Sequence, residues 1–130
     1  MSILPVYASL LGLLFVVLSV QTIRVRRRRQ IALGDAGDPA MLRAIRVHSN
    51  FAEYVPLSLV LIHLVETQLA WPLLVHALGA LLLLARLSHA YGVSQARENF
   101  RFRIFGMIAT FSVLVVSALA LLLAKATQLA

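Results

Sequence analysis

The sequence has no cysteine and little charge. Charged residues make up 13% of the chain, about half of what a soluble domain carries, and 5 acidic residues face 12 basic ones. Without cysteine the chain has no disulfide framework, no Cys-ligated zinc site and no thiol nucleophile. Hydrophobic residues account for 61% of the 130 positions, and the mean hydropathy is +0.89. These values exclude an ordinary soluble domain and indicate a small integral membrane protein with a single domain, residues 1–130.

Three apolar runs are long enough to cross a bilayer. We expect spanning helices over residues 3–23, 71–93 and 104–125, because about 20 apolar residues match a hydrocarbon core about 30 Å thick. Positive charge follows the first run instead of preceding it, which excludes a cleaved secretory signal. Residues 41–66 are less typical, but we predict a fourth span there, with its polar first half buried in protein rather than facing lipid. The predicted fold class is all-α, a transmembrane four-helix bundle.

Arginines gather in two of the predicted connections. Arg24 and Arg26–Arg29 follow the first helix, while Arg97, Arg101 and Arg103 lie around the start of the last. The positive-inside rule therefore predicts a multi-pass protein of the cell inner membrane, with both basic loops in the cytoplasm and both termini outside. Since this distribution explains the net charge of +7, we expect no nucleic-acid partner. We interpret the Arg26–Arg29 run as a topology anchor that contacts anionic lipids.

Prolines mark the helix starts. Asp38 followed by Pro39 is typical of an N-cap and a first helical position, and Pro72 suits the first turn of the third helix. Inside the second helix, Pro56 predicts a kink, because proline removes one backbone hydrogen bond.

The most informative residues are polar ones within the spans. Arg46, Asn50 and Glu53 recur at i, i+4 and i+7 and so share one helix face, while Arg86 and His89 form a similar face on the third helix. Charged residues inside a membrane mark a functional site or a buried pair. Arginines would take carboxylates and Glu53 an ammonium group, which favours a zwitterionic ligand with several carboxylates.

A purely structural role is an equal alternative for part of this set. Arg86 could simply neutralise Glu53, giving a buried pair that fixes helix register. However, Arg43, Arg101 and Arg103 belong to the same end of the bundle, so cations exceed the available carboxylates. We expect no metal, because the histidines are isolated along the chain and a metal needs several converging ligands.

The segment Arg46–Pro56, RVHSNFAEYVP, resembles the second-helix motif of the MAPEG family, the membrane-associated proteins in eicosanoid and glutathione metabolism. That motif, R-x-x-x-N-x-x-E-x-x-P, is met at every position, and Tyr54 follows the glutamate as it often does in the family. The stretches GDAG at 34–37 and RLSHAYG at 86–92 resemble the short bacterial branch. Four helices with basic loops on one side fit this resemblance along the whole chain.

The resemblance implies a homotrimer that binds glutathione between adjacent subunits near the cytoplasmic side. Carried over by position, the glutathione contacts would be Arg24, Arg46, Asn50, Glu53, Tyr54, Arg86, His89 and Tyr91. Family enzymes use an arginine at the start of the fourth helix to stabilise the thiolate, which here means Arg103 or, as second choice, Arg101. Val93 takes another expected aromatic position and Tyr91 falls on a different helical face, which departs from the mammalian pattern.

These implications lead to a hypothesis of function. The protein would be a glutathione transferase or peroxidase in which glutathione is the co-substrate, no metal takes part, and the thiolate attacks a lipophilic electrophile in the bilayer. The alternative is a non-catalytic membrane protein of the same fold that binds glutathione or lipid. A small transporter or channel subunit ranks last, because the polar cluster lies on one side instead of crossing the membrane.

Overall fold

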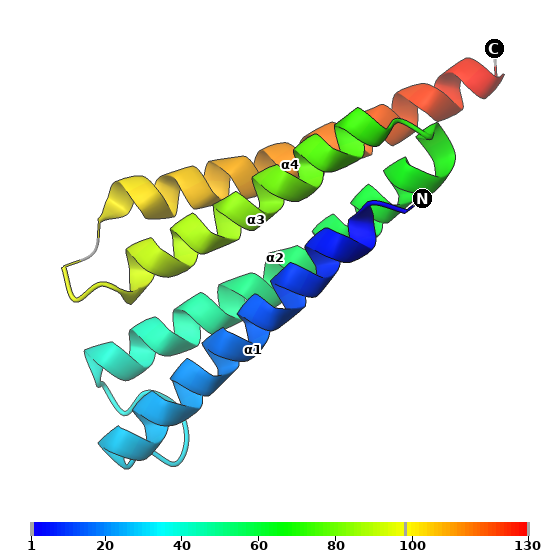
Figure 1. Ribbon diagram of the computed structural model, residues 1–130. Helices are drawn as coiled ribbons and strands as arrows, with labels where there is room; N and C mark the ends of the chain where they lie inside the picture. The colour runs from blue at the N-terminus through cyan, green and yellow to red at the C-terminus, as the bar shows by residue number, and fades with distance from the viewer. Residues whose placement is uncertain (1, 98, 130) are drawn as a thin grey trace.

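The computed structural model describes residues 2–97 and 99–129, and this part of the chain forms four helices, α1 (Leu4–Arg29), α2 (Pro39–Leu69), α3 (Pro72–Ser94) and α4 (Phe100–Leu129) (Figure 1). The α1–α2 and α3–α4 connections lie at one end of the bundle, which we call the basic end. Both termini and the α2–α3 turn lie toward the opposite end, the outer end. The predicted all-α four-helix class is confirmed. By length and composition, α1, α3 and α4 can each cross a membrane.

The helix starts follow the predicted capping chemistry. Asp38 is the N-cap of α2, and its carboxylate accepts a hydrogen bond from the Met41 N–H at 2.8 Å. Pro39 and Pro72 are the first residues of α2 and α3. The helix α2 continues through Pro56, where the sequence predicts a kink, and reaches Leu69 unbroken.

Two helices are longer than the apolar runs that predicted them. Helix α1 continues from residue 23 through the arginines to Arg29, and α4 begins at Phe100 instead of residue 104. An apolar run marks the part of a helix that lies in the hydrocarbon, whereas arginine is itself a good helix former. Both helices therefore extend beyond these apolar runs at the basic end.

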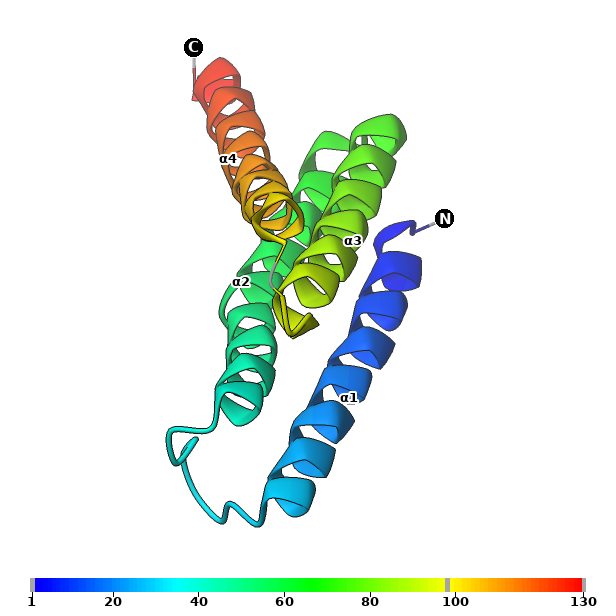
Figure 2. The same cartoon turned by 90° about the vertical axis from the view of Figure 1, so that its left-hand side faces the viewer.

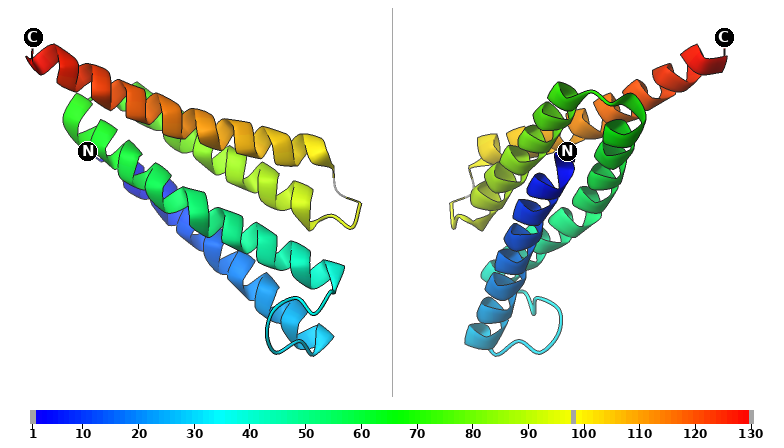
Figure 3. Two further views of the ribbon diagram at one scale, coloured as in Figure 1. Left: turned by 180° about the vertical axis from the view of Figure 1, so that it is seen from behind. Right: turned by 45° about the vertical axis from the view of Figure 1, so that its right-hand side comes forward.

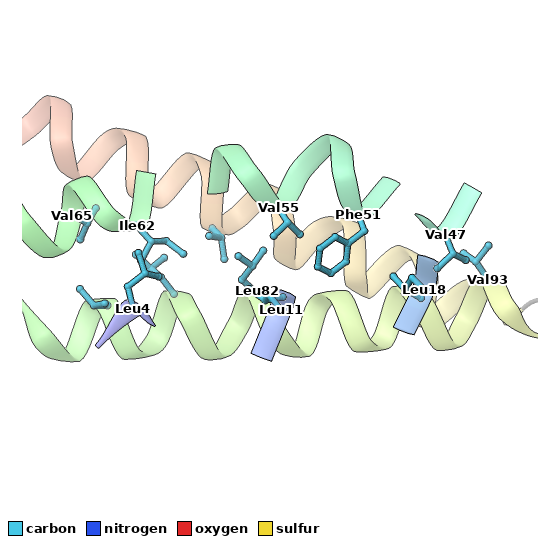
Figure 4. Packing of buried hydrophobic residues seen from close by; sticks show 13 residues of the cluster. Leu4, Leu11, Leu18, Val47, Phe51, Val55, Ile62, Val65, Leu82 and Val93 are labelled. Carbon is cyan, nitrogen blue, oxygen red and sulfur yellow. The ribbon is translucent and has the colours of Figure 1, made fainter. Parts of the chain in front are cut away.

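The helices α2 and α3 form the middle of the bundle. Helix α1 packs on α2 and α3, whereas α4 packs on α3 and α2 and does not contact α1 within the described residues (Figure 2). Buried apolar side chains fill the space between α1, α2 and α3 (Figure 4). Helix α1 supplies Leu4, Leu11 and Leu18, one residue every two turns, and most of its exposed side chains before Arg24 are apolar. Such an outer surface suits contact with lipid or with another subunit.

Small residues bring α3 and α4 together at the basic end. A Cβ atom at Gly106 would lie 2.7 Å from the Ala85 carbonyl oxygen and 2.7 Å from the His89 Cβ, so no larger residue fits. A Cβ at Gly92 would lie 2.8 Å from the Phe102 Cβ. Close backbone approach through small residues is typical of helices packed in membranes. Figure 3 shows α4 running along α3 and then extending past the other helices toward the C-terminus.

Candidate functional site

A cavity of about 430 Å³ lies between α2, α3 and α4 at the basic end, and we call it the α2–α4 cavity. Among the described residues, its charged lining consists of Arg43, Arg46 and Arg103 with one carboxylate, Glu53. Its other lining residues are Leu42, Ser49, Asn50, His89 and Val93. This volume lies within the range of small-molecule sites, about 300–1,000 Å³.

The polar stripe of α2 forms one wall of this cavity. Arg46, Asn50 and Glu53 all line it, as their helical spacing predicts. Arg46 and Glu53 are exposed in the single chain, so the expectation that the polar half of α2 is buried in protein is wrong for one chain alone. The reason is geometric, because α3 and α4 leave the cavity open on this side. Any cover must come from outside the chain.

Arg86 lies beneath the cavity instead of lining it. Its side chain is 1% exposed, and its Nη1 donates to the Asn50 Oδ1 at 2.7 Å. Its Nη2 donates to the Gly106 carbonyl oxygen at 3.2 Å and contacts the Met107 sulfur at 3.8 Å. Glu53 has no ion pair among the described residues, so the alternative Arg86–Glu53 pair is not formed. Arg86 instead ties α2, α3 and α4 together and fixes the Asn50 amide, whose NH₂ group is left to donate elsewhere.

The structure separates the two arginines that open α4. Arg103 lines the α2–α4 cavity together with the buried His89 of α3. Arg101 is exposed and does not line it, and its backbone N–H donates to the Asn99 Oδ1 at 3.1 Å. Arg103 is therefore the arginine placed to act on a ligand in this cavity.

Three other predicted site residues lie elsewhere. Arg24 lines a second cavity, between α1 and α2, and not the α2–α4 cavity. Tyr54 packs edge-on against Phe111 with ring centroids 5.4 Å apart. Tyr91 is exposed and packs in the same manner on Phe102 at 5.2 Å, away from the cavity lining, as its helical position implies.

Four lining residues were not among the predicted site residues: Leu42, Arg43, Ser49 and Val93. Ser49 lies three residues after Arg46 and four before Glu53, a spacing that places it on the same face of α2. This spacing could have identified Ser49 as a site residue. The serine carries no charge, however, so a search for charged residues within the spans does not find it.

The polar residues of the outer end serve the fold. Glu66 of α2 accepts hydrogen bonds from the Ser2 hydroxyl at 2.6 Å, from the Ile3 N–H and from the Leu4 N–H at 3.1 Å. It therefore caps the start of α1, which has free N–H groups and no capping side chain of its own. In the described part of the chain, no three His, Asp or Glu side chains gather in a group that could hold a metal ion.

Comparisons with known proteins agree on one family. The model of the MAPEG family matches residues 4–123. The chain is 39% identical over 114 residues to the inner membrane protein YecN of Escherichia coli strain K12, covering 88% of this chain and 86% of that protein. YecN of Escherichia coli O6:H1 strain CFT073 gives the same identity and coverage.

Proposed function

The chain belongs to the MAPEG family, which includes glutathione transferases, and from this premise we propose that it binds glutathione in the α2–α4 cavity and activates its thiol. The observation that carries the proposal is the charge lining of this cavity, three arginines and one carboxylate at the basic end. Glutathione presents the complementary set, two carboxylates and one ammonium group beside its thiol.

Each charged side chain has a chemical counterpart on the ligand. Arg43 and Arg46 bind carboxylates, since a guanidinium donates two parallel hydrogen bonds to one carboxylate. Glu53 binds the ammonium group, and its lack of an ion pair among the described residues leaves its oxygens for that purpose. The amide NH₂ of Asn50, held by Arg86, donates to the peptide backbone of the ligand.

Arg103 activates the thiol. A thiol with the pKa of free cysteine, about 8.5, is mostly protonated at neutral pH. A guanidinium within about 4–6 Å stabilises the thiolate and lowers this pKa. Val93 forms an apolar part of the cavity wall and excludes water there, which strengthens the attraction between the two charges.

Two reactions use the same thiolate. In conjugation, the sulfur attacks an electrophilic carbon, the leaving group departs with its electron pair, and the thiol proton goes to solvent. In peroxide reduction, two glutathione molecules and one lipid hydroperoxide give glutathione disulfide, an alcohol and water. Both need a lipophilic electrophile that enters from the bilayer, beside a thiolate held in position.

We further propose that the site is completed by a neighbouring subunit of a homotrimer. Arg24 lies at the other cavity of its own chain, so it reaches glutathione only in the site of an adjacent subunit. Exposure of Arg46 and Glu53 in one chain supports this arrangement.

The name of the relative YecN supports an inner-membrane location for this chain. The arginines at the basic end support an orientation with this end in the cytoplasm.

Calorimetry on the detergent-purified protein tests the proposal. The wild type is expected to bind glutathione, and Glu53→Ala and Arg46→Ala are expected to weaken binding at least tenfold, about 1.4 kcal/mol each or more. Arg27→Ala is the matched control, because Arg27 is exposed and lies outside the α2–α4 cavity. The proposal would be refuted if the folded wild type did not bind glutathione. It would also be refuted if Arg27→Ala weakened glutathione binding as much as the other two substitutions.

Non-catalytic binding by the same fold is the second candidate function. The departures at Val93 and Tyr91 from the aromatic pattern of the mammalian enzymes favour it. Turnover with an activated aryl halide separates the two functions. Retained binding with no conjugate formed over the uncatalysed rate would establish the non-catalytic alternative.

A further inference from the structure

We infer that the cavity between α1 and α2 at the basic end, here called the α1–α2 cavity, binds the phosphate head group of an anionic membrane phospholipid. This cavity has a volume of about 380 Å³ and also touches the last residue of α3, Ser94. Arg24 and Arg28 of α1 and Arg43 of α2 line it. Arg43 also lines the α2–α4 cavity, and Arg24 is proposed above to reach the glutathione of an adjacent subunit. The inference is therefore tested at Arg28, which lines the α1–α2 cavity and not the α2–α4 cavity.

The charge of the α1–α2 cavity is not neutralised by any described residue. Arg24, Arg28 and Arg43 form no hydrogen bond or ion pair within this part of the chain. None of the described lining residues is acidic. Three guanidinium groups around one hollow repel each other, and an anion between them removes that cost. Phosphate is the anion whose oxygens match the donors of arginine.

Other arginines of the same run are already used by the fold. Arg26 donates to the carbonyl oxygens of Ile31 at 3.3 Å and Gly34 at 3.1 Å, which holds the α1–α2 loop. Arg29 pairs with Asp38 at 3.5 Å. Within the run, Arg26 and Arg29 therefore hold the loop and Arg28 faces the α1–α2 cavity, while the Arg27 side chain does neither among the described residues.

The position of the α1–α2 cavity identifies a lipid as the source of the phosphate. Arg24 is the first charged residue after the apolar run of α1, so the cavity lies where α1 leaves the hydrocarbon. Phospholipid phosphates lie at this level. Leu18, Val25 and Val47 form the apolar part of the lining, and the adjoining surface of α1 exposes Val17. These residues suit the glycerol and the first carbons of an acyl chain better than they suit a soluble anion.

Native mass spectrometry of the whole protein, titrated with phosphatidylglycerol or with phosphatidylcholine of the same acyl chains, tests this inference. The expected result is retention of phosphatidylglycerol in preference to phosphatidylcholine. Arg28→Gln should weaken that retention about tenfold, because it removes charge-assisted hydrogen bonds to phosphate.

Arg27→Gln is the matched control, since Arg27 is the neighbouring residue of the run and does not line the α1–α2 cavity. A site at this cavity predicts that the control retains the lipid as the wild type does. Equal losses in the two variants would overturn the inference, because a diffuse basic surface responds to charge alone. Equal retention of both lipids by the wild type would also overturn it.

Added glycerol phosphate and inorganic phosphate distinguish the two sources of the anion. We expect that neither glycerol phosphate nor inorganic phosphate displaces phosphatidylglycerol at millimolar concentration, because both compounds lack acyl chains. Displacement by either would overturn the lipid assignment in favour of a soluble phosphate ligand. Glutathione titrations of Arg28→Gln keep this test separate from the proposed function, because Arg28 does not line the α2–α4 cavity.

Discussion

The two carboxylates in the predicted second span, Glu53 and Glu66, belong to the same helix and have opposite surroundings. Glu66 at the outer end accepts hydrogen bonds from the Ser2 hydroxyl and from two N–H groups at the start of α1. Glu53 at the basic end forms no ion pair among the described residues and lines a cavity with three arginines. A carboxylate that accepts hydrogen bonds from its own chain stabilises the fold, whereas a carboxylate that faces a cavity without such donors can bind a ligand.

The same contrast divides the arginines. Arg86 is buried and tied to Asn50 and Gly106, so it belongs with Glu66 among the residues that stabilise the fold. Arg46 lines the cavity with Glu53 and is exposed. Charge alone does not separate structural from ligand-binding residues. The contacts that each charge makes inside the chain do.

The largest effect is expected from Arg86→Ala. Removing this side chain leaves the Asn50 Oδ1 without its donor and opens a cavity between three helices. It also takes one of two side-chain donors from the Gly106 carbonyl, which keeps the Thr110 hydroxyl. Unfolding in detergent should show a loss of about 3–5 kcal/mol. Arg101→Ala is the control, since the exposed Arg101 should change stability by about 0.5 kcal/mol or less. Equal stability of the two variants would contradict the role of Arg86 in stabilising the fold.

Next in size is the effect of Arg103→Ala on the conjugation rate. Loss of the group proposed to stabilise the thiolate should lower the rate about 10²–10³-fold, with a much smaller change in glutathione affinity. Arg101→Ala, which removes the same charge outside the cavity, should stay within about threefold of the wild type. If Arg101→Ala lost activity equally, general positive charge rather than position would be responsible.

A smaller effect is expected from Glu66→Gln. The variant loses the charge of the cap on α1 and one acceptor, so the free energy of unfolding should fall by about 1–2 kcal/mol. Glutathione affinity should not change, because Glu66 lies at the outer end. Weaker glutathione binding in a folded Glu66→Gln protein would break the division between the two ends.

The smallest effect is expected at the start of α2. Asp38→Ala removes the N-cap hydrogen bond to Met41 and should lower stability by about 1 kcal/mol. The control is Asp35→Ala, since among the described residues the Asp35 carboxylate accepts only from the Gly37 N–H, within the α1–α2 loop. Thermal unfolding of both variants checks this, and a larger loss in Asp35→Ala would contradict the capping assignment.

The sequence predicted the elements of the fold well, because the signals for them are local. Apolar runs located the spans, and Asp38 with Pro39 and Pro72 located two helix starts. The spacing of Arg46, Asn50 and Glu53 also placed them correctly on one face.

Contacts between distant residues could not be predicted in this way. The partners of Glu66 lie at the start of the chain, and no periodicity links them. Pairing with Glu53 was one alternative for Arg86 and contact with a ligand was the other, whereas the structure gives Arg86 the Asn50 side chain as its partner. The division of the Arg26–Arg29 run likewise depends on which face of α1 meets α2, and composition does not specify this.

The most direct test of the different roles of Glu53 and Glu66 is to measure Tm with and without saturating glutathione. The proteins compared are the wild type, Glu53→Gln and Glu66→Gln. A ligand that binds only the folded state raises Tm, so this shift reports binding while the unliganded Tm reports the fold. We predict that Glu53→Gln has the unliganded Tm of the wild type and no Tm shift with glutathione. We predict that Glu66→Gln has a lower unliganded Tm and the same shift as the wild type. The reverse pattern, or the same pattern in both variants, would contradict the assignment of the two carboxylates.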